Sequence, residues 1–224
     1  GYVVDSLDID AGVALVHAED PGYGTFAREL TDITVTGPGE RVDYGPVTLG
    51  LVPVSVVHRV VGYLRRRPSG EVIDFVDLDM PEQQLTTMAA MYTISPEALH
   101  RRGVDAARIP GSLHAAEHAA IGLLPLVASC DRGDIGGVST QFGESGLPTV
   151  FVYDGHPGGA GFAERGYRSA TTWLDATAAA IEACECPHGC PSCVQSPKCG
   201  NGNDPLDKSG AVQVLRLVLS ELRR

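Results

Sequence analysis

Five of the six cysteines of this 224-residue chain gather near its C-terminus, and thiols at such short spacing are suited to binding a metal ion. Structural zinc is usually held by four ligands in a tetrahedron, with thiolate sulfur atoms about 2.3 Å from the ion. Prolines and glycines between the cysteines let the backbone turn tightly enough to aim these sulfur atoms at one centre. The spacing therefore predicts one structural zinc ion per chain and no catalytic residue. The five cysteines are Cys184, Cys186, Cys190, Cys193 and Cys199.

One of the five cysteines must stay outside a tetrahedral site. We expect this to be Cys184, as a reserve ligand or a thiol beside the site, and His188 is a further candidate ligand. Lys198 and Lys208 would offset the negative charge of the thiolates. Because structural zinc contributes roughly 10–16 kcal/mol in small peptides, segment 184–203 is expected to be disordered without metal. The predicted ligands are Cys186, Cys190, Cys193 and Cys199.

Disulfides and iron–sulfur clusters are the alternatives for these thiols. The chain shows no secretory signal, and reducing compartments keep thiols free, so zinc is favoured over disulfides. The spacing Cys186-x3-Cys190-x2-Cys193 also occurs in radical iron–sulfur enzymes. Their cysteine loop lies early in a barrel, however, and has an aromatic residue where this chain has Ser192. An iron–sulfur cluster without radical chemistry stays an open alternative.

A second motif, His114-Ala115-Ala116-Glu117-His118, places two imidazoles one helical turn apart beside a carboxylate. Inverted zinc peptidases use this arrangement, together with a carboxylate from another helix. Only Glu164 and Glu182 are candidates for that carboxylate, and neither is convincing. We therefore favour a buried hydrogen-bond network or a groove lining over a peptidase site.

A glycine-rich turn, 155–161, follows the apolar run 149–153 and precedes a helical stretch that continues through Tyr167. Backbone amides at such a helix start could bind a phosphate, although close packing of the helix on the strand explains the glycines equally well. The chain contains no Gly-x-x-x-x-Gly-Lys-Ser/Thr motif, so it is not by itself a P-loop motor.

The elements that position these residues fall into two halves. Residues 1–95 are rich in β-branched runs interrupted by Gly and Pro, which predicts a β-rich subdomain with an antiparallel sheet. Residues 96–224 predict a mixed helical and strand subdomain that carries the cysteine segment, and Ser95 with Pro96 is suited to starting its first helix. The predicted fold class is therefore α+β with a four-cysteine zinc module. Further helices are predicted at 112–126, 171–183 and 210–222.

Charge limits the function classes. The net charge of −11 and the pI near 5.0 exclude a free-standing nucleic-acid binder, because phosphate binding needs a positive surface. Any DNA contact must be local. No apolar run is long enough to span a membrane, so we expect a cytoplasmic protein with no membrane partner. The candidate DNA-binding residues are Arg65, Arg66, Arg67, Lys198 and Lys208.

Four stretches in this order, 111–119, 130–137, 153–161 and 184–211, resemble the C-terminal region of mitomycin repair factor A helicases. The most specific is the last, because its cysteines are embedded in a long shared pattern. This family, with bacterial SftH-type and fungal Hrq members, comprises superfamily 2 enzymes that move 3′ to 5′ on single-stranded DNA in crosslink repair. The resemblance implies that this chain is the zinc module following two motor domains, which lie outside it and bind ATP and Mg²⁺, and that it is nucleoid-associated.

Three hypotheses follow for the module. It could guide single-stranded DNA that leaves the motor. Alternatively, it could be architectural, packing on the motor domains of the same polypeptide and stabilising their active arrangement. The third hypothesis, a zinc metallopeptidase, requires metal at His114 and His118.

Overall fold

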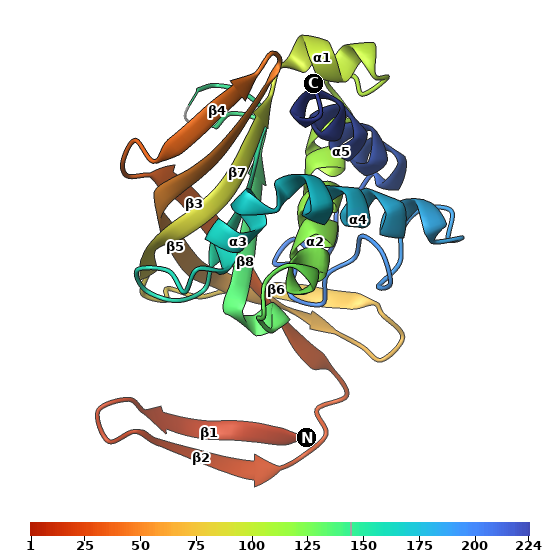
Figure 1. Ribbon diagram of the computed structural model, residues 1–224. Coiled ribbons are helices and arrows are strands. Elements are labelled where there is room, and N and C mark those ends of the chain that lie inside the picture. Colours follow the sequence, from red (N-terminus) through yellow and green to blue (C-terminus); the bar gives the residue numbers. More distant parts are fainter. Residues whose placement is uncertain (144) are drawn as a thin grey trace. The chain divides into compact units, whose positions relative to one another are not determined.

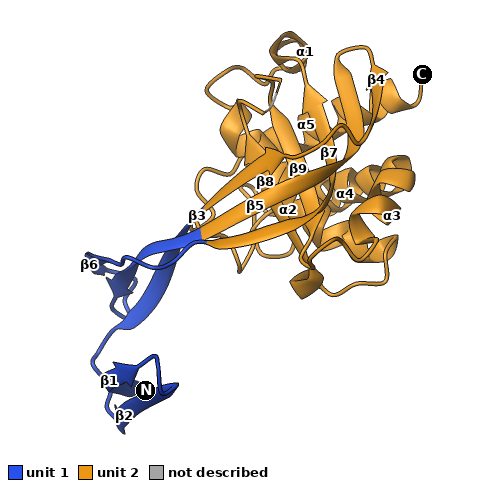
Figure 2. Ribbon diagram, turned by 90° about the vertical axis from the view of Figure 1, so that its left-hand side faces the viewer, with its two compact units in different colours: residues 1–30, 59–82 blue, residues 31–58, 83–224 orange. Residues whose placement is uncertain are grey.

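A computed structural model describes residues 1–143 and 145–224, which form two compact units (Figures 1 and 2). The first unit contains residues 1–30 and 59–82, and the second contains residues 31–58 and 83–224. The predicted boundary after residue 95 falls inside the second unit and stays a prediction about domains. The predicted α+β class is confirmed, since an antiparallel β-rich part, residues 2–94, precedes a part in which helices, two further strands and the cysteine cluster follow.

The larger unit is built on an antiparallel sheet with the strand order β3-β5-β7-β9-β8. Its longest ladder joins β5 to β7, from Val47 opposite Ile94 to His58 opposite Gln83. The β-branched residues predicted in this half pack well on a pleated surface, which explains the long strands. The strands are β3 (Gly24–Val35), β4 (Glu40–Tyr44), β5 (Val47–Arg66), β7 (Gln83–Ile94), β8 (Ile135–Thr140) and β9 (Thr149–Asp154), of which residues 24–30 and 59–66 belong to the smaller unit.

Alternate side chains of the central strands are buried on opposite faces of this sheet. On β9, for example, Val150 and Val152 join the large core beneath the helices, whereas Phe151 and Tyr153 join a smaller cluster on the other face. This period of two is what a strand buried on both faces requires. Strand β9 is buried along its whole length, and it leads directly into the glycine turn.

The helices cover one face of the sheet (Figure 1). As predicted, the Ser95 side chain caps the first helix, accepting a hydrogen bond from the Ala98 amide, with Pro96 in the first turn. The second helix starts earlier than predicted because Pro110 fits a first helical turn. The helical elements are α1 (Pro96–Arg101), α2 (Ile109–Leu123), η1 (Leu124–Leu126), η2 (Arg132–Asp134), α3 (Phe162–Arg168), α4 (Ala170–Ala183) and α5 (Lys208–Leu222).

Helix α2 is the central helix of this layer and packs against α4 and α5. Trp173 of α4 is 2% exposed, and its indole Nε1 donates a hydrogen bond to the Ala120 carbonyl oxygen of α2 at 2.8 Å. This contact satisfies the polar atom of the largest buried side chain in the core. None of the helices in the described ranges is both long and apolar enough to cross a membrane.

The smaller unit has a different character. It contains the hairpin of β1 (Tyr2–Asp8) and β2 (Val13–Ala18), and β6 (Val72–Asp77). All of its residues are described, and none of its hydrophobic side chains is buried. Ile9 is 81% exposed and Tyr2 is 74% exposed. Strands β1 and β2 form a two-stranded sheet of their own, and an isolated hairpin of this kind is at best marginally stable in water.

Candidate metal centres

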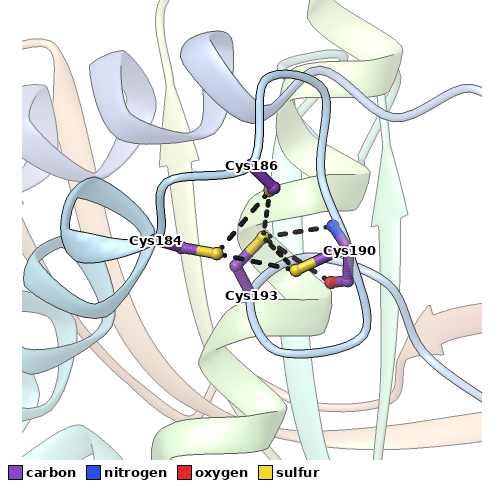
Figure 3. A group of neighbouring side chains, drawn as sticks. All are labelled: Cys184, Cys186, Cys190 and Cys193. Carbon is purple, nitrogen blue, oxygen red and sulfur yellow. Dashed lines mark hydrogen bonds between the residues drawn. The ribbon is translucent and has the colours of Figure 1, made fainter.

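Four thiols converge on one point at the end of α4 (Figure 3). Neighbouring sulfur atoms lie 3.5 to 3.8 Å apart. Four sulfur atoms at about 2.3 Å from a common centre would be separated by about 3.8 Å, so the observed spacing fits tetrahedral zinc. All six cysteines are described and free, which removes the disulfide alternative. The four are Cys184, Cys186, Cys190 and Cys193.

The predicted ligands are thus only partly brought together. Cys186, Cys190 and Cys193 share the cluster with Cys184, the expected reserve, whereas Cys199 lies against His114 of α2. His188 is absent from both groups of potential ligands found among the described residues. The sequence could not place Cys199, because its position depends on the turn that follows it and on the path of α2.

Tight turns before and after Cys190, the third cysteine of the cluster, aim the sulfur atoms inward. The amides of Cys193 and Gln195 both donate to the Cys190 carbonyl oxygen, at 3.0 and 3.1 Å. Gly189 has a φ of 112°, which side chains rarely adopt, and a Cβ there would press on Val194. Val194 is fully buried and anchors the turn in the core beneath the helices.

The electrostatics of the cluster differ between its thiols. The Lys208 ammonium donates hydrogen bonds to the carbonyl oxygens of Cys184 and Cys186, at 2.5 and 2.6 Å, and lies 3.5 Å from Cys186 Sγ. Desolvation opposes ionisation of Cys186, but hydrogen bonds from the neighbouring thiols outweigh it and lower its pKa to about 7. Burial raises the pKa of Cys193 to about 12, so metal binding must displace its proton.

The histidines of the second motif lie one above the other on α2, with ring centroids 4.2 Å apart. Glu117 between them is buried at 6% exposure. Neither carboxylate considered for a peptidase joins them among the described residues: Glu182 pairs with Arg216 and Glu164 pairs with Arg168. The arrangement therefore lacks the third ligand of an inverted zinc peptidase.

The carboxylate of Asp154, directly before the glycine turn, binds the backbone amides of this turn. Asp154 is fully buried at the end of β9 and accepts hydrogen bonds from the amides of Ala160, Gly161 and Ala163, at 2.6 to 2.8 Å. These are the amides at the start of α3 that a phosphate would use. Close packing of helix on strand, rather than phosphate binding, accounts for this turn.

Several of the candidate DNA-binding side chains are engaged within the chain. Arg65 forms a bidentate ion pair with Asp74, and Arg67 pairs with Glu71. The Arg66 guanidinium lies over the ring of Phe26. Of the two lysines, Lys208 is held by the cysteine cluster, whereas Lys198 is exposed.

Comparisons with known proteins agree on one family. The model of the MrfA Zn-binding domain matches residues 116–194. An uncharacterized protein of Methanocaldococcus jannaschii, MJ1572.1, is 38% identical over 48% of this chain and all of its own length. The uncharacterized ATP-dependent helicase YprA of Bacillus subtilis is 30% identical over 86% of this chain.

A solved structure matches almost the whole chain. The crystal structure of the DUF1998 helicase MrfA bound to DNA superposes with a TM-score of 0.64 and 26% identity, covering 97% of this chain. The chain spans 26% of the length of YprA and 28% of that MrfA chain. These two helicases therefore contain large parts that have no counterpart here.

Proposed function

This chain belongs to the family of MrfA Zn-binding domains, and from that membership we propose that it is the accessory zinc domain of an ATP-dependent DNA helicase. The parent enzyme would move 3′ to 5′ on single-stranded DNA in crosslink repair, and its motor domains would bind ATP and Mg²⁺. It would act in the cytoplasm at the nucleoid. The match to a helicase structure over 97% of the chain is the observation that carries this proposal.

The zinc ligands we propose are the four clustered thiols. Cys184 replaces Cys199, which the sequence predicted as the fourth ligand. Their separations fit a tetrahedron, and all four lie within the matched range 116–194, whereas Cys199 lies outside it. Four thiolates leave no open coordination position, so the zinc is structural. Lys208 offsets part of the negative charge, and Val194 joins the loop to the core.

We propose that the module acts mainly by architecture, stabilising the motor domains of the same polypeptide. The supporting observation is the β1–β2 hairpin of the smaller unit, whose Ile9, Leu7 and Leu15 are 81, 66 and 59% exposed. Leu7 pairs with Ala14 and Leu15 with Ser6, so exposed apolar side chains lie on both faces of the hairpin, which indicates a protein contact that the chain alone does not supply. The parts of the helicase outside this chain are the natural source of that contact.

The test is made in the full-length helicase with Leu7→Glu and Leu15→Glu combined. An architectural role predicts a loss of ATPase activity with the zinc content unchanged, because the hairpin is remote in sequence from the cysteines. Asp10→Asn in the same hairpin is the matched control and should keep full activity. ATPase activity that is unaffected by the double substitution would contradict the architectural role.

Guidance of single-stranded DNA is the second candidate, since the matched MrfA structure is bound to DNA. Lys198 is the basic residue best placed for it, because it is exposed next to Cys199. If Lys198 contacts a phosphate, Lys198→Gln should weaken DNA binding uniformly across sequences and reduce the dependence of affinity on salt. A DNA affinity whose salt dependence survives deletion of the whole module would reject guidance.

A further inference from the structure

Three potential metal ligands outside the four-thiol cluster meet between α2 and the loop that precedes α5. One ligand atom each from His114, His118 and Cys199 lies within 4.8 Å of the others. His114 Nε2 lies 3.4 Å from Cys199 Sγ. The two residues are 85 positions apart, so the fold, and not local sequence, creates this group.

Both imidazoles are held in the orientation that metal-binding histidines require. Their Nδ1 atoms lie 2.9 Å from backbone carbonyl oxygens, of Pro205 for His114 and of Val194 for His118. A carbonyl oxygen only accepts, so each Nδ1 carries the proton and each Nε2 is left with a lone pair. Metal-binding histidines usually donate their other N–H group to an oxygen in this way.

The third ligand, Cys199, is prepared as a thiolate. Its Sγ accepts a hydrogen bond from the Asn203 amide at 3.2 Å. Asn203 has a φ of 65°, and its side chain bonds both the amide and the carbonyl oxygen of Ser196, at 2.7 and 3.0 Å. These bonds close the loop around the thiol, so Cys199 is positioned independently of the four-thiol cluster.

The charge around the group also suits a cation. Glu117 is almost fully buried on α2 between the two histidines. A divalent ion with one thiolate and two neutral imidazoles carries a net charge of +1, and Glu117 is the acidic residue next to it on α2. A buried carboxylate is costly without a nearby positive charge, and the ion would supply one.

We propose that His114, His118 and Cys199 form a second metal site, which takes one zinc-class divalent ion. Two imidazoles and one thiolate are ligands that zinc accepts, and three protein ligands leave a fourth position for water. The ion would fix α2 to the loop between the four-thiol cluster and α5. The third protein ligand is a thiolate, and not the second-helix carboxylate of a zinc peptidase, which separates this site from the peptidase hypothesis.

The unmodified protein provides the first test. Purified full chain should contain two zinc ions, measured by elemental analysis. X-ray absorption at the zinc edge should show nitrogen neighbours at about 2.0 Å beside the sulfur neighbours at about 2.3 Å. One zinc ion with sulfur neighbours alone would overturn the second site. Because this measurement needs no substitution, it remains decisive even if the variants fail to fold.

Single substitutions then separate the two sites. Cys199→Ser and His118→Gln should each reduce the content from two zinc ions to one and remove the nitrogen neighbours, leaving four sulfur neighbours. Cys193→Ser should leave one ion with nitrogen neighbours. Retention of two ions in both Cys199→Ser and His118→Gln would reject the second site, and retention of two ions in Cys193→Ser would instead reject the four-thiol site of the proposed function.

Matched controls exclude general effects of losing a thiol or an imidazole. Cys130→Ser removes the one cysteine that lies in neither group, and His100→Gln removes a histidine of α1. Both should keep two zinc ions.

The competing arrangement is a metal-free ion pair between the Cys199 thiolate and the His114 imidazolium. Rapid alkylation of Cys199 in the zinc-loaded protein would support that pair and overturn the proposal.

Discussion

The Nζ atom of Lys208 lies 2.6 Å from the carbonyl oxygen of Cys186 and 3.5 Å from its Sγ, so the first residue of α5 closes the four-thiol loop. The same ammonium donates to the Cys184 carbonyl oxygen. The Lys208 ammonium thus contacts both ends of segment 184–186, through two carbonyl oxygens and one sulfur atom. This contact links zinc binding to the packing of α5.

Replacing this cation should weaken zinc binding without unfolding the chain. Lys208→Met keeps the length of the side chain but removes its charge and donors, and we expect about 10- to 100-fold lower zinc affinity, as for other groups that hydrogen-bond metal ligands. Competition with a chromogenic chelator measures the change. Lys198→Met is the control, because among the described residues no hydrogen bond joins Lys198 Nζ to the four thiols. An equal loss of affinity in both variants would contradict the role of Lys208.

Removal of zinc should disorder segment 184–203 and leave the sheet folded. Outside the cluster, this segment is anchored chiefly by Val194 and by the contacts of Cys199, whereas the sheet has its own core. Trypsin should therefore cleave after Lys198 rapidly in chelator-treated protein and slowly in zinc-loaded protein. Mass spectrometry of timed digests gives the two rates. Equal rates would show that the loop is ordered without metal.

The zinc site was predictable in kind because few arrangements other than a metal site bring so many thiols together at such short spacing. The full ligand set was not. Cys184 ends α4 and Cys199 follows a separate turn, so the choice between them depends on where the helix stops and which way the loop leaves it. The spacing of the cysteines in the sequence specifies neither where α4 ends nor which way the loop leaves it.

The fold shows the same division. Runs of β-branched residues interrupted by Gly and Pro predicted the strands, and Ser95 with Pro96 predicted the start of α1. The filling of the glycine turn by Asp154 could not be predicted, although an acidic residue directly before the turn was a signal. The carbonyl oxygens of Pro205 and Val194, which accept hydrogen bonds from the two histidines, were also not predicted. Every residue has a backbone carbonyl, so the residue types do not show which ones accept.

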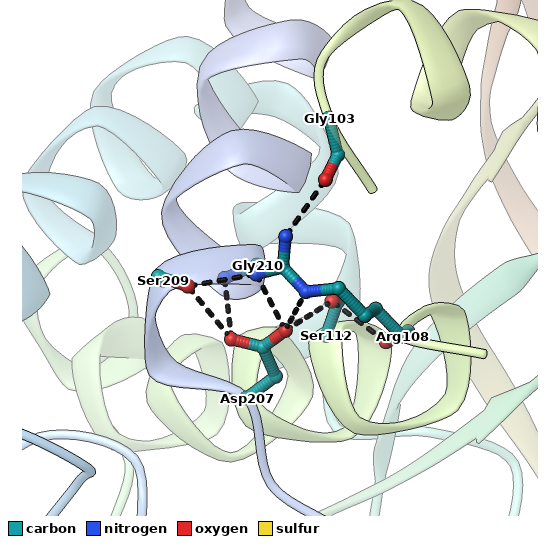
Figure 4. Close-up of polar contacts among 6 residues, drawn as sticks. All are labelled: Gly103, Arg108, Ser112, Asp207, Ser209 and Gly210. Carbon is teal, nitrogen blue, oxygen red and sulfur yellow. Dashed lines mark hydrogen bonds and ion pairs between the residues drawn. The ribbon is translucent and has the colours of Figure 1, made fainter. Parts of the chain in front are cut away.

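The start of α5 should make stability depend on pH (Figure 4). Partial burial opposes ionisation of Asp207, but hydrogen bonds from Gly210, Ser209 and Arg108 outweigh it and lower its pKa. A carboxyl group whose folded-state pKa is lowered stabilises fully above its unfolded pKa, about 3.9, and this stabilisation is lost as pH falls through the folded pKa. We expect Asp207→Asn to be less stable than the parent by about 1 kcal/mol at pH 7.

The difference between the two proteins should shrink toward zero in acid, because the parent carboxyl group is then also neutral. Urea unfolding at several pH values, with equal zinc in both samples, measures this difference while zinc release affects both alike. Asp207→Ala removes the helix cap as well and should cost about 1 to 2 kcal/mol at pH 7. A constant difference between the parent and Asp207→Asn down to acid pH would contradict the lowered pKa.

Two helical glycines should respond to alanine in opposite directions. Gly210 lies where α5 approaches α2, and a Cβ there would overlap Ser112 Oγ and crowd the Asp207 carboxylate. Gly210→Ala should therefore lower the free energy of unfolding by about 1 to 3 kcal/mol. Gly122 is an exposed residue of α2, and a Cβ there meets no atom within 4 Å among the described residues. Gly122→Ala should raise the free energy of unfolding by about 0.5 to 1 kcal/mol, since alanine loses less backbone entropy than glycine when the helix forms.

Urea unfolding of both variants in parallel measures the two changes in the free energy of unfolding. Destabilisation by both substitutions would show that the space around the added Cβ does not decide the effect of alanine at these two glycines.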